Sequence, residues 1–149
     1  MNIWKIRSFL ALCALLLMSG CASVSMMTAD EDARGKTFTP PKDKANIYLY
    51  RNETFGAAIK MPVSVNGKLA GQTASKTYFL WQVSPGTYDV SSVTENTSTV
   101  KLMVEAGKNY FVWQEVKMGL LMARSELKQV DEGAGRAGVA ECSRAQSEF

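Results

Sequence analysis

The chain has 149 residues, enough for one globular domain, with seventeen basic and fourteen acidic side chains and a net charge of +3. This small excess, without a basic stripe, argues against a nucleic-acid partner. The sequence contains no histidine, which removes the commonest general base and metal ligand.

Residues 1–20 have the composition of a secretory signal peptide. Lys5 and Arg7 form a short basic segment, Phe9–Met18 is an unbroken apolar run, and small residues follow it. A transmembrane helix needs roughly 20 apolar residues, more than this run provides. We therefore expect a signal segment and no permanent membrane span.

The stretch Met18-Ser19-Gly20-Cys21 resembles the bacterial lipobox. The resemblance implies that Cys21 becomes the first mature residue and carries acyl chains, which would anchor the protein in a membrane. An alternative is ordinary cleavage at Gly20-Cys21-Ala22, which would release a secreted soluble binding protein. In Gram-negative lipoproteins an aspartate after the cysteine usually signals inner-membrane retention. Ala22 therefore favours the outer membrane, with the domain on its periplasmic face.

The next segment, residues 21–44, mixes small, charged and proline residues without apolar periodicity. This texture predicts a lipidated N-terminus followed by a flexible tether.

Residues 45–130 carry short runs of alternating apolar and polar residues, separated by turn signals every 8–12 residues. This pattern predicts a single all-β sandwich of seven or eight short antiparallel strands. One hairpin has a specific signal, because Asn66-Gly67 suits a type I′ turn in which both central residues have positive φ. The stretch Gly119–Val130 is expected to continue the strand pattern.

The last nineteen residues, 131–149, are expected to form a glycine-rich C-terminal tail, with a short helix or no regular structure from Val139 onward. Cys13 would leave with the signal and Cys21 would be lipidated. Cys142 would then be the remaining thiol, either buried and free or joined to another molecule by a disulfide.

One aromatic motif occurs twice, as ASKTYFLWQ (Ala74–Gln82) and as AGKNYFVWQ (Ala106–Gln114), with six of nine positions identical. Runs that are apolar on both faces are typical of central strands, which would each pack a tryptophan and which could lie in different sheets. The alternative is an exposed aromatic shelf that binds a glycan strand or an envelope protein. The residues of this possible binding surface are Tyr48, Tyr50, Trp81 and Trp113.

Residues 45–130 also resemble a bacterial lipoprotein family known as domain of unknown function 2846. The resemblance rests on the motifs NIYLYRNETFG, VSVNGKLAGQT, VSPGTYDV and AGKNYFVWQ in this order after a lipobox. Parts of the pattern are also similar to small PEGA-type and carboxypeptidase-regulatory-like sandwich modules. The resemblance implies a β-sandwich and assigns no catalytic or binding residue.

No Gly-x-Ser-x-Gly elbow, phosphate-binding glycine loop or paired-cysteine zinc motif is present. Two Ser-x-x-Lys strings, Ser98–Lys101 and Ser125–Lys128, fall in expected strands, where an offset of three puts the two side chains on opposite faces. The sequence therefore predicts a lipid-anchored cell-envelope protein without enzymatic activity, cofactor or metal, with a binding or structural role. A glycan- or peptidoglycan-binding module is the alternative.

Overall fold

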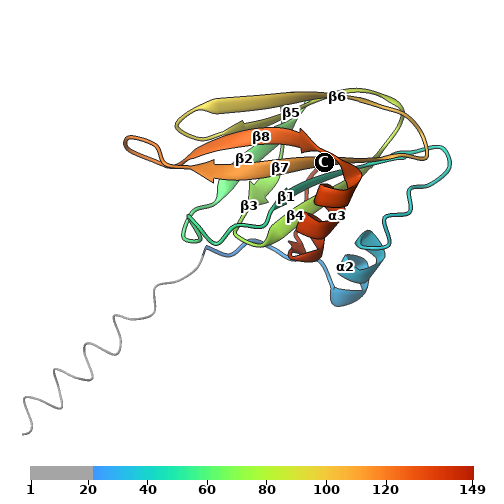
Figure 1. Ribbon diagram of the computed structural model, residues 1–149, viewed down its shortest axis with the longest axis horizontal. Coiled ribbons are helices and arrows are strands. Elements are labelled where there is room, and N and C mark those ends of the chain that lie inside the picture. The colour runs from blue at the N-terminus through green and yellow to red at the C-terminus, as the bar shows by residue number, and fades with distance from the viewer. Residues whose placement is uncertain (1–21) are drawn as a thin grey trace, which may run out of the picture.

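The computed structural model describes residues 22–149, which form two packed β-sheets flanked by two short helices (Figure 1). The expected signal peptide and lipid-attachment residue Cys21 lie outside the described residues. The strands are β1 (Ala45–Arg51), β2 (Met61–Val65), β3 (Lys68–Thr73), β4 (Thr77–Val83), β5 (Gly86–Val93), β6 (Thr97–Val104), β7 (Asn109–Lys117), β8 (Arg124–Val130) and β9 (Ser143–Arg144). The helices are α2 (Ala29–Gly35) and α3 (Glu132–Ala140). Neither of these two helices is long and apolar enough to cross a membrane.

One sheet has the strand order β8-β7-β1-β4-β9, and the other has the order β3-β2-β5-β6. The expected two-sheet, predominantly β architecture is confirmed, but the expectation of purely antiparallel strands is wrong. β1 pairs in parallel with β7, and β4 pairs in parallel with β9. Parallel neighbours need a long crossover. Between β1 and β7 the chain makes such a crossover by passing through the four-stranded sheet. The crossover from β4 to β9 is longer, and α3 is its last element.

The two copies of the aromatic motif form β4 and β7, which flank β1 in the same sheet. The expectation of central strands is correct, whereas the suggestion that they belong to different sheets is not. The aromatic side chains of the two copies lie on opposite faces of this sheet. Phe79 and Trp81 pack between the sheets, whereas Phe111 and Trp113 lie on the outer face of the five-stranded sheet. The repeat therefore serves two different packing environments.

The helices α2 and α3 cover the outer face of the five-stranded sheet. Segments near both ends of the described chain are therefore packed against this sheet. The hydroxyl of Tyr48 donates to the carbonyl of Gly35 at 2.8 Å, and that of Tyr78 donates to the carbonyl of Asp32 at 3.2 Å. Thr28 and Glu31 form a capping box that starts α2. The expected flexible tether over residues 21–44 is therefore corrected within its described part, because buried tyrosines bind α2.

The expected glycine-rich tail, 131–149, is likewise corrected. Asp131 caps α3, whose glycines allow the helix to lie directly on aromatic rings of the sheet. A Cβ on Gly135 would stand 2.1 Å from Phe111 Cγ, and one on Gly138 would stand 2.1 Å from Tyr50 Cε2. These glycines mark close helix–sheet packing rather than a loose segment.

Two local expectations are settled by the structure. Asn66 and Gly67 have φ values of 50° and 76°, which confirms the positive-φ hairpin turn between β2 and β3.

Cys142 is a free thiol that is 2% exposed and packed beneath α3. Burial raises the pKa of this thiol to about 12. Its burial argues against an intermolecular disulfide.

Replacing Gly138 with alanine tests the close packing of α3. We expect Gly138→Ala to lower the free energy of unfolding by about 1–3 kcal/mol, because the clash with Tyr50 outweighs a gain of roughly 1 kcal/mol in helix propensity. Urea unfolding measures the change. In the matched control Gly133→Ala, the new Cβ would meet Asp131 Oδ1 at 3.2 Å, and we expect a change within about 1 kcal/mol. Equal losses in both variants would contradict this account.

Candidate binding surface at the loop end of the sandwich

The aromatic residues proposed from the sequence as a binding surface are largely buried. Tyr48 is 0%, Trp81 2% and Tyr50 4% exposed, and Trp113 is partly buried. Burial raises the pKa of Tyr48 and Tyr50 to about 12. Trp81 also lies on the opposite face of the sheet from the other three. These side chains form parts of two cores, so the glycan-binding hypothesis loses the exposed shelf that it required.

A different surface is formed where four loops meet at one end of the sandwich, which we call the loop end. The loops are 52–60, 74–76, 94–96 and 118–123. β1 and β7 run parallel and both finish at this end, while β2, β4, β6 and β8 begin there. The 118–123 loop projects from the molecule beyond the sheets (Figure 1).

Six large apolar side chains are exposed on two of these loops. We call them the end patch: Phe55, Ile59, Met118, Leu120, Leu121 and Met122. Leu120 is 89% exposed and Leu121 is 94% exposed. The residues line a shared hollow of about 310 Å³. Isolated apolar residues are common on protein surfaces, but a contiguous group of this kind is typical of a contact surface.

Sequence reasoning missed the end patch because it continued the strand pattern through Gly119–Ala123, whereas β8 begins at Arg124. The signal was present, since Met118–Met122 contains no polar side chain. Loops between strands are normally polar, so an apolar loop at this position is itself informative.

The carboxylate of Glu95, in the neighbouring 94–96 turn, holds the backbone of the projecting loop. It accepts backbone N–H bonds from Leu120 at 3.1 Å, Leu121 at 2.8 Å and Met122 at 2.9 Å. The Arg124 guanidinium donates to it at 2.8 Å. These backbone bonds, and then Arg124, lower the pKa of Glu95 to about 2. The loop is therefore held in a shape that turns its leucines outward.

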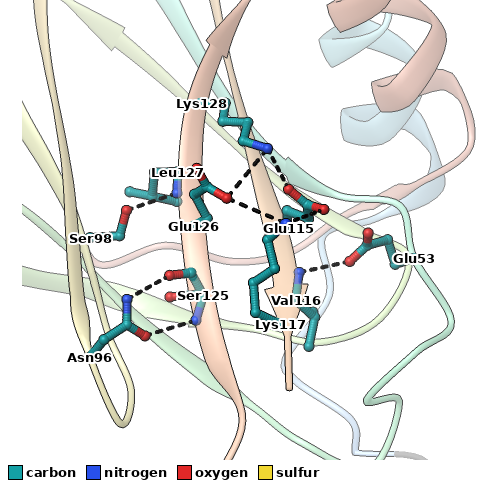
Figure 2. Close-up of polar contacts among 10 residues, drawn as sticks. All are labelled: Glu53, Asn96, Ser98, Glu115, Val116, Lys117, Ser125, Glu126, Leu127 and Lys128. Atoms are coloured by element: carbon teal, nitrogen blue, oxygen red, sulfur yellow. Dashed lines mark hydrogen bonds and ion pairs between the residues drawn. The ribbon is translucent and has the colours of Figure 1, made fainter. Parts of the chain in front are cut away.

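The 52–60 loop is held by a charge of the opposite sign. The guanidinium of Arg51 is fully buried and donates to the carbonyls of Gly56 at 2.6 Å and Ile59 at 2.8 Å. Burial lowers the pKa of Arg51. The Glu53 carboxylate accepts the backbone N–H of Val116 at 2.8 Å, at a point on β7 beyond the last residue paired with β1 (Figure 2). The carbonyls of Gly56 and Ile59 in this loop are thus satisfied within the protein.

Beneath the loop end, four buried polar side chains connect the two sheets. Gln114 donates to Ser92 at 2.7 Å, Ser125 donates to Ser92 at 2.7 Å, and Thr73 donates to Gln114. All four are at most 1% exposed. A buried polar network whose members are hydrogen-bonded favours one arrangement of the sheets.

Side chains of the 94–96 turn and of β6 bind the backbone of the edge strand β8 (Figure 2). Asn96 donates to the carbonyl of Ser125 at 2.9 Å and accepts the N–H of Ser125 at 3.1 Å. Ser98 accepts the N–H of Leu127 at 2.9 Å. Because these backbone groups already have partners, addition of a foreign strand at this part of the edge is disfavoured.

On the outer face of β7 and β8, two lysines and two glutamates form a shared ion-pair cluster (Figure 2). Lys128 lies 2.6 Å from Glu115 and 3.3 Å from Glu126, and Lys117 lies 2.7 Å and 3.4 Å from the same two carboxylates. Hydrogen bonds from both lysines lower the pKa of Glu115. Lys128 also belongs to one Ser-x-x-Lys string, but its partner Ser125 faces the core, as the strand prediction required.

Neutralising Glu95 tests how the projecting loop is held. At neutral pH we expect Glu95→Gln to speed amide hydrogen exchange of Leu120–Met122 by about tenfold or more, because a neutral amide is a weaker acceptor. The matched control Glu105→Gln, in the exposed turn at the opposite end, should leave that exchange unchanged. Unaltered exchange in Glu95→Gln would contradict the proposed role.

The same carboxylate should titrate at unusually low pH. Its folded pKa of about 2 lies below the ordinary 4.5, so its contribution to loop order is present above pH 4.5 and is lost as the pH falls through about 2. NMR amide shifts of Leu121 and Met122 should follow that midpoint in the wild-type protein. They should be flat in Glu95→Gln. A midpoint near 4.5 would refute the assignment.

Two comparisons with known proteins bear on these residues. A family model described as protein of unknown function (DUF2846) matches residues 41–126, which include Arg51, Glu95 and both loops of the end patch. A Haemophilus influenzae protein described as uncharacterized is 31% identical over 134 residues, covering 89% of this chain and 80% of that protein. The further likeness to PEGA-type modules stays a prediction. The family resemblance inferred from the motifs is confirmed, and the chain belongs to the DUF2846 family of proteins of unknown function.

Proposed function

We propose that this protein is a lipid-anchored component of the cell envelope with a non-enzymatic binding role, and that the loop end is its binding surface. The observation that carries the binding role is the end patch, six exposed apolar side chains on loops whose backbone is held by Arg51 and Glu95. A contact surface that is ordered before binding loses less conformational entropy when a partner arrives.

The anchor is supported by the sequence. The basic residues, the apolar run and Met18-Ser19-Gly20-Cys21 follow the order of a lipoprotein signal. Two or three acyl chains on Cys21 would add roughly 0.8 kcal/mol for each buried methylene group, enough for stable membrane attachment. Ala22 after the cysteine favours the periplasmic face of the outer membrane.

The chemistry of the loop end supports binding rather than catalysis. Glu53 and Glu95 use their carboxylates to bind backbone N–H groups, and Arg51 uses its guanidinium to bind carbonyls. A general acid or base needs a pKa near the working pH. The lowered pKa of Glu95 takes that carboxylate further from neutrality.

Metabolic labelling with a palmitate analogue tests the anchor. We expect wild-type protein to carry the label and to fractionate with membranes at high salt, and Cys21→Ser to carry no label, because serine lacks the thiol that receives diacylglycerol. Cys13→Ser is the matched control and should behave as the wild type. An unlabelled wild-type protein, or equal labelling of Cys21→Ser, would rule out attachment at Cys21.

A further inference from the structure

We infer that the end patch contacts the lipid bilayer that carries the anchor, so that the domain rests with its loop end on the membrane. This inference names the partner of the proposed binding surface and rests on the proposed lipid attachment at Cys21. Its first support is the place at which the described chain begins.

Ala22 lies at the loop end, where its backbone N–H donates to the carbonyl of Ala57 at 3.0 Å. Ala57 belongs to the 52–60 loop, between the patch residues Phe55 and Ile59. Figure 1 shows the N-terminal segment starting beside this loop. Consecutive Cα atoms lie about 3.8 Å apart, so acyl chains on Cys21 would leave the protein next to the end patch. A bilayer that holds those chains is therefore brought against the patch.

Five backbone polar groups of the two patch loops already have partners within the protein, which lowers the cost of bringing these loops against a bilayer. An unpaired N–H or carbonyl costs several kcal/mol in hydrocarbon, so a loop can enter the apolar boundary only where its polar groups have partners. Glu95 binds the three N–H groups of Leu120–Met122, and Arg51 binds the carbonyls of Gly56 and Ile59. The projecting loop exposes the side chains of Leu120, Leu121 and Met122.

The projecting loop carries no charge into this contact, whereas the 52–60 loop carries Glu53, which binds the N–H of Val116, and the exposed Lys60. Met118–Ala123 contains no ionisable side chain, and Lys117 at its base is paired with Glu115 and Glu126. The contact depends on apolar burial and should persist at high salt, unlike binding through a basic surface. With the acyl chains supplying attachment, the additional effect of the patch is to orient the domain.

The experiment uses the purified full-length lipoprotein in vesicles of phosphatidylethanolamine and phosphatidylglycerol. Leu121→Cys carries an environment-sensitive fluorophore, and Glu105→Cys, in the turn at the opposite end, is the matched control. Cys142 does not compete for the label, because it is 2% exposed and burial raises the pKa of its thiol to about 12. Spin-labelled lipid quenches a fluorophore that lies in the bilayer, and flotation with the vesicles reports the anchor separately.

We expect blue-shifted emission from position 121 and about twofold or more stronger quenching there than at position 105, unchanged at high salt. Replacing Leu120 and Met122 together with serine should weaken the quenching at position 121. Met103→Ser, at an apolar side chain that is 78% exposed, should leave it unchanged.

Three outcomes would overturn the inference, and they separate it from the proposed anchor. Floated protein with equal, weak quenching at both positions would keep the anchor and reject the membrane contact. A blue shift without quenching by lipid would assign the patch to a protein partner or to a second copy of this chain. Protein that does not float would reject the anchor itself, and the membrane contact with it.

Discussion

All seven residues of β1 are buried, and a strand that is buried on both faces requires a covering layer on each side of its sheet. Ile47 and Leu49 face the four-stranded sheet, which is the ordinary contact of a sandwich. Tyr48 and Tyr50 face the other way, and the chain covers them with α2 and α3. The segments before and after the strands are therefore as much a part of the fold as the sheets are.

The burial of β1 extends to its last residue, Arg51, and this explains how the loop end is built. A fully buried guanidinium must find acceptors, and the nearest ones are the carbonyls of the loop that follows β1. In the 118–123 loop the charges are reversed, because the carboxylate of Glu95 accepts hydrogen bonds from the backbone N–H groups. Both loops gain order from a charged group bound to their backbone. Their apolar side chains are not needed for the interior and remain on the surface.

The sequence identified those features that depend on neighbouring residues. Apolar residues on both faces identified β4 and β7 as central strands, and Asn66-Gly67 identified its turn, because both signals are local. The parallel pairing of β1 with β7 is a choice between sheet partners that alternation does not encode. Gly135 and Gly138 suggested disorder in isolation, and their packing role becomes visible once Phe111 and Tyr50 lie opposite them. The burial of the aromatic residues likewise depends on which surface the helices cover.

The same topology relates the end patch to the rest of the molecule. Because β1 and β7 are parallel, the loops that follow them emerge side by side, which brings the patch residues Phe55 and Ile59 next to the 118–123 loop. At the other end, exposed charged residues include Lys68 at the start of β3, and Glu105 and Lys108 in the turn after β6. With the anchor proposed at Cys21, a domain that has the end patch beside the anchor and these charged residues opposite would have a preferred orientation on a bilayer. A water-borne partner would then meet the charged end first, and an apolar partner would have to compete with lipid for the other.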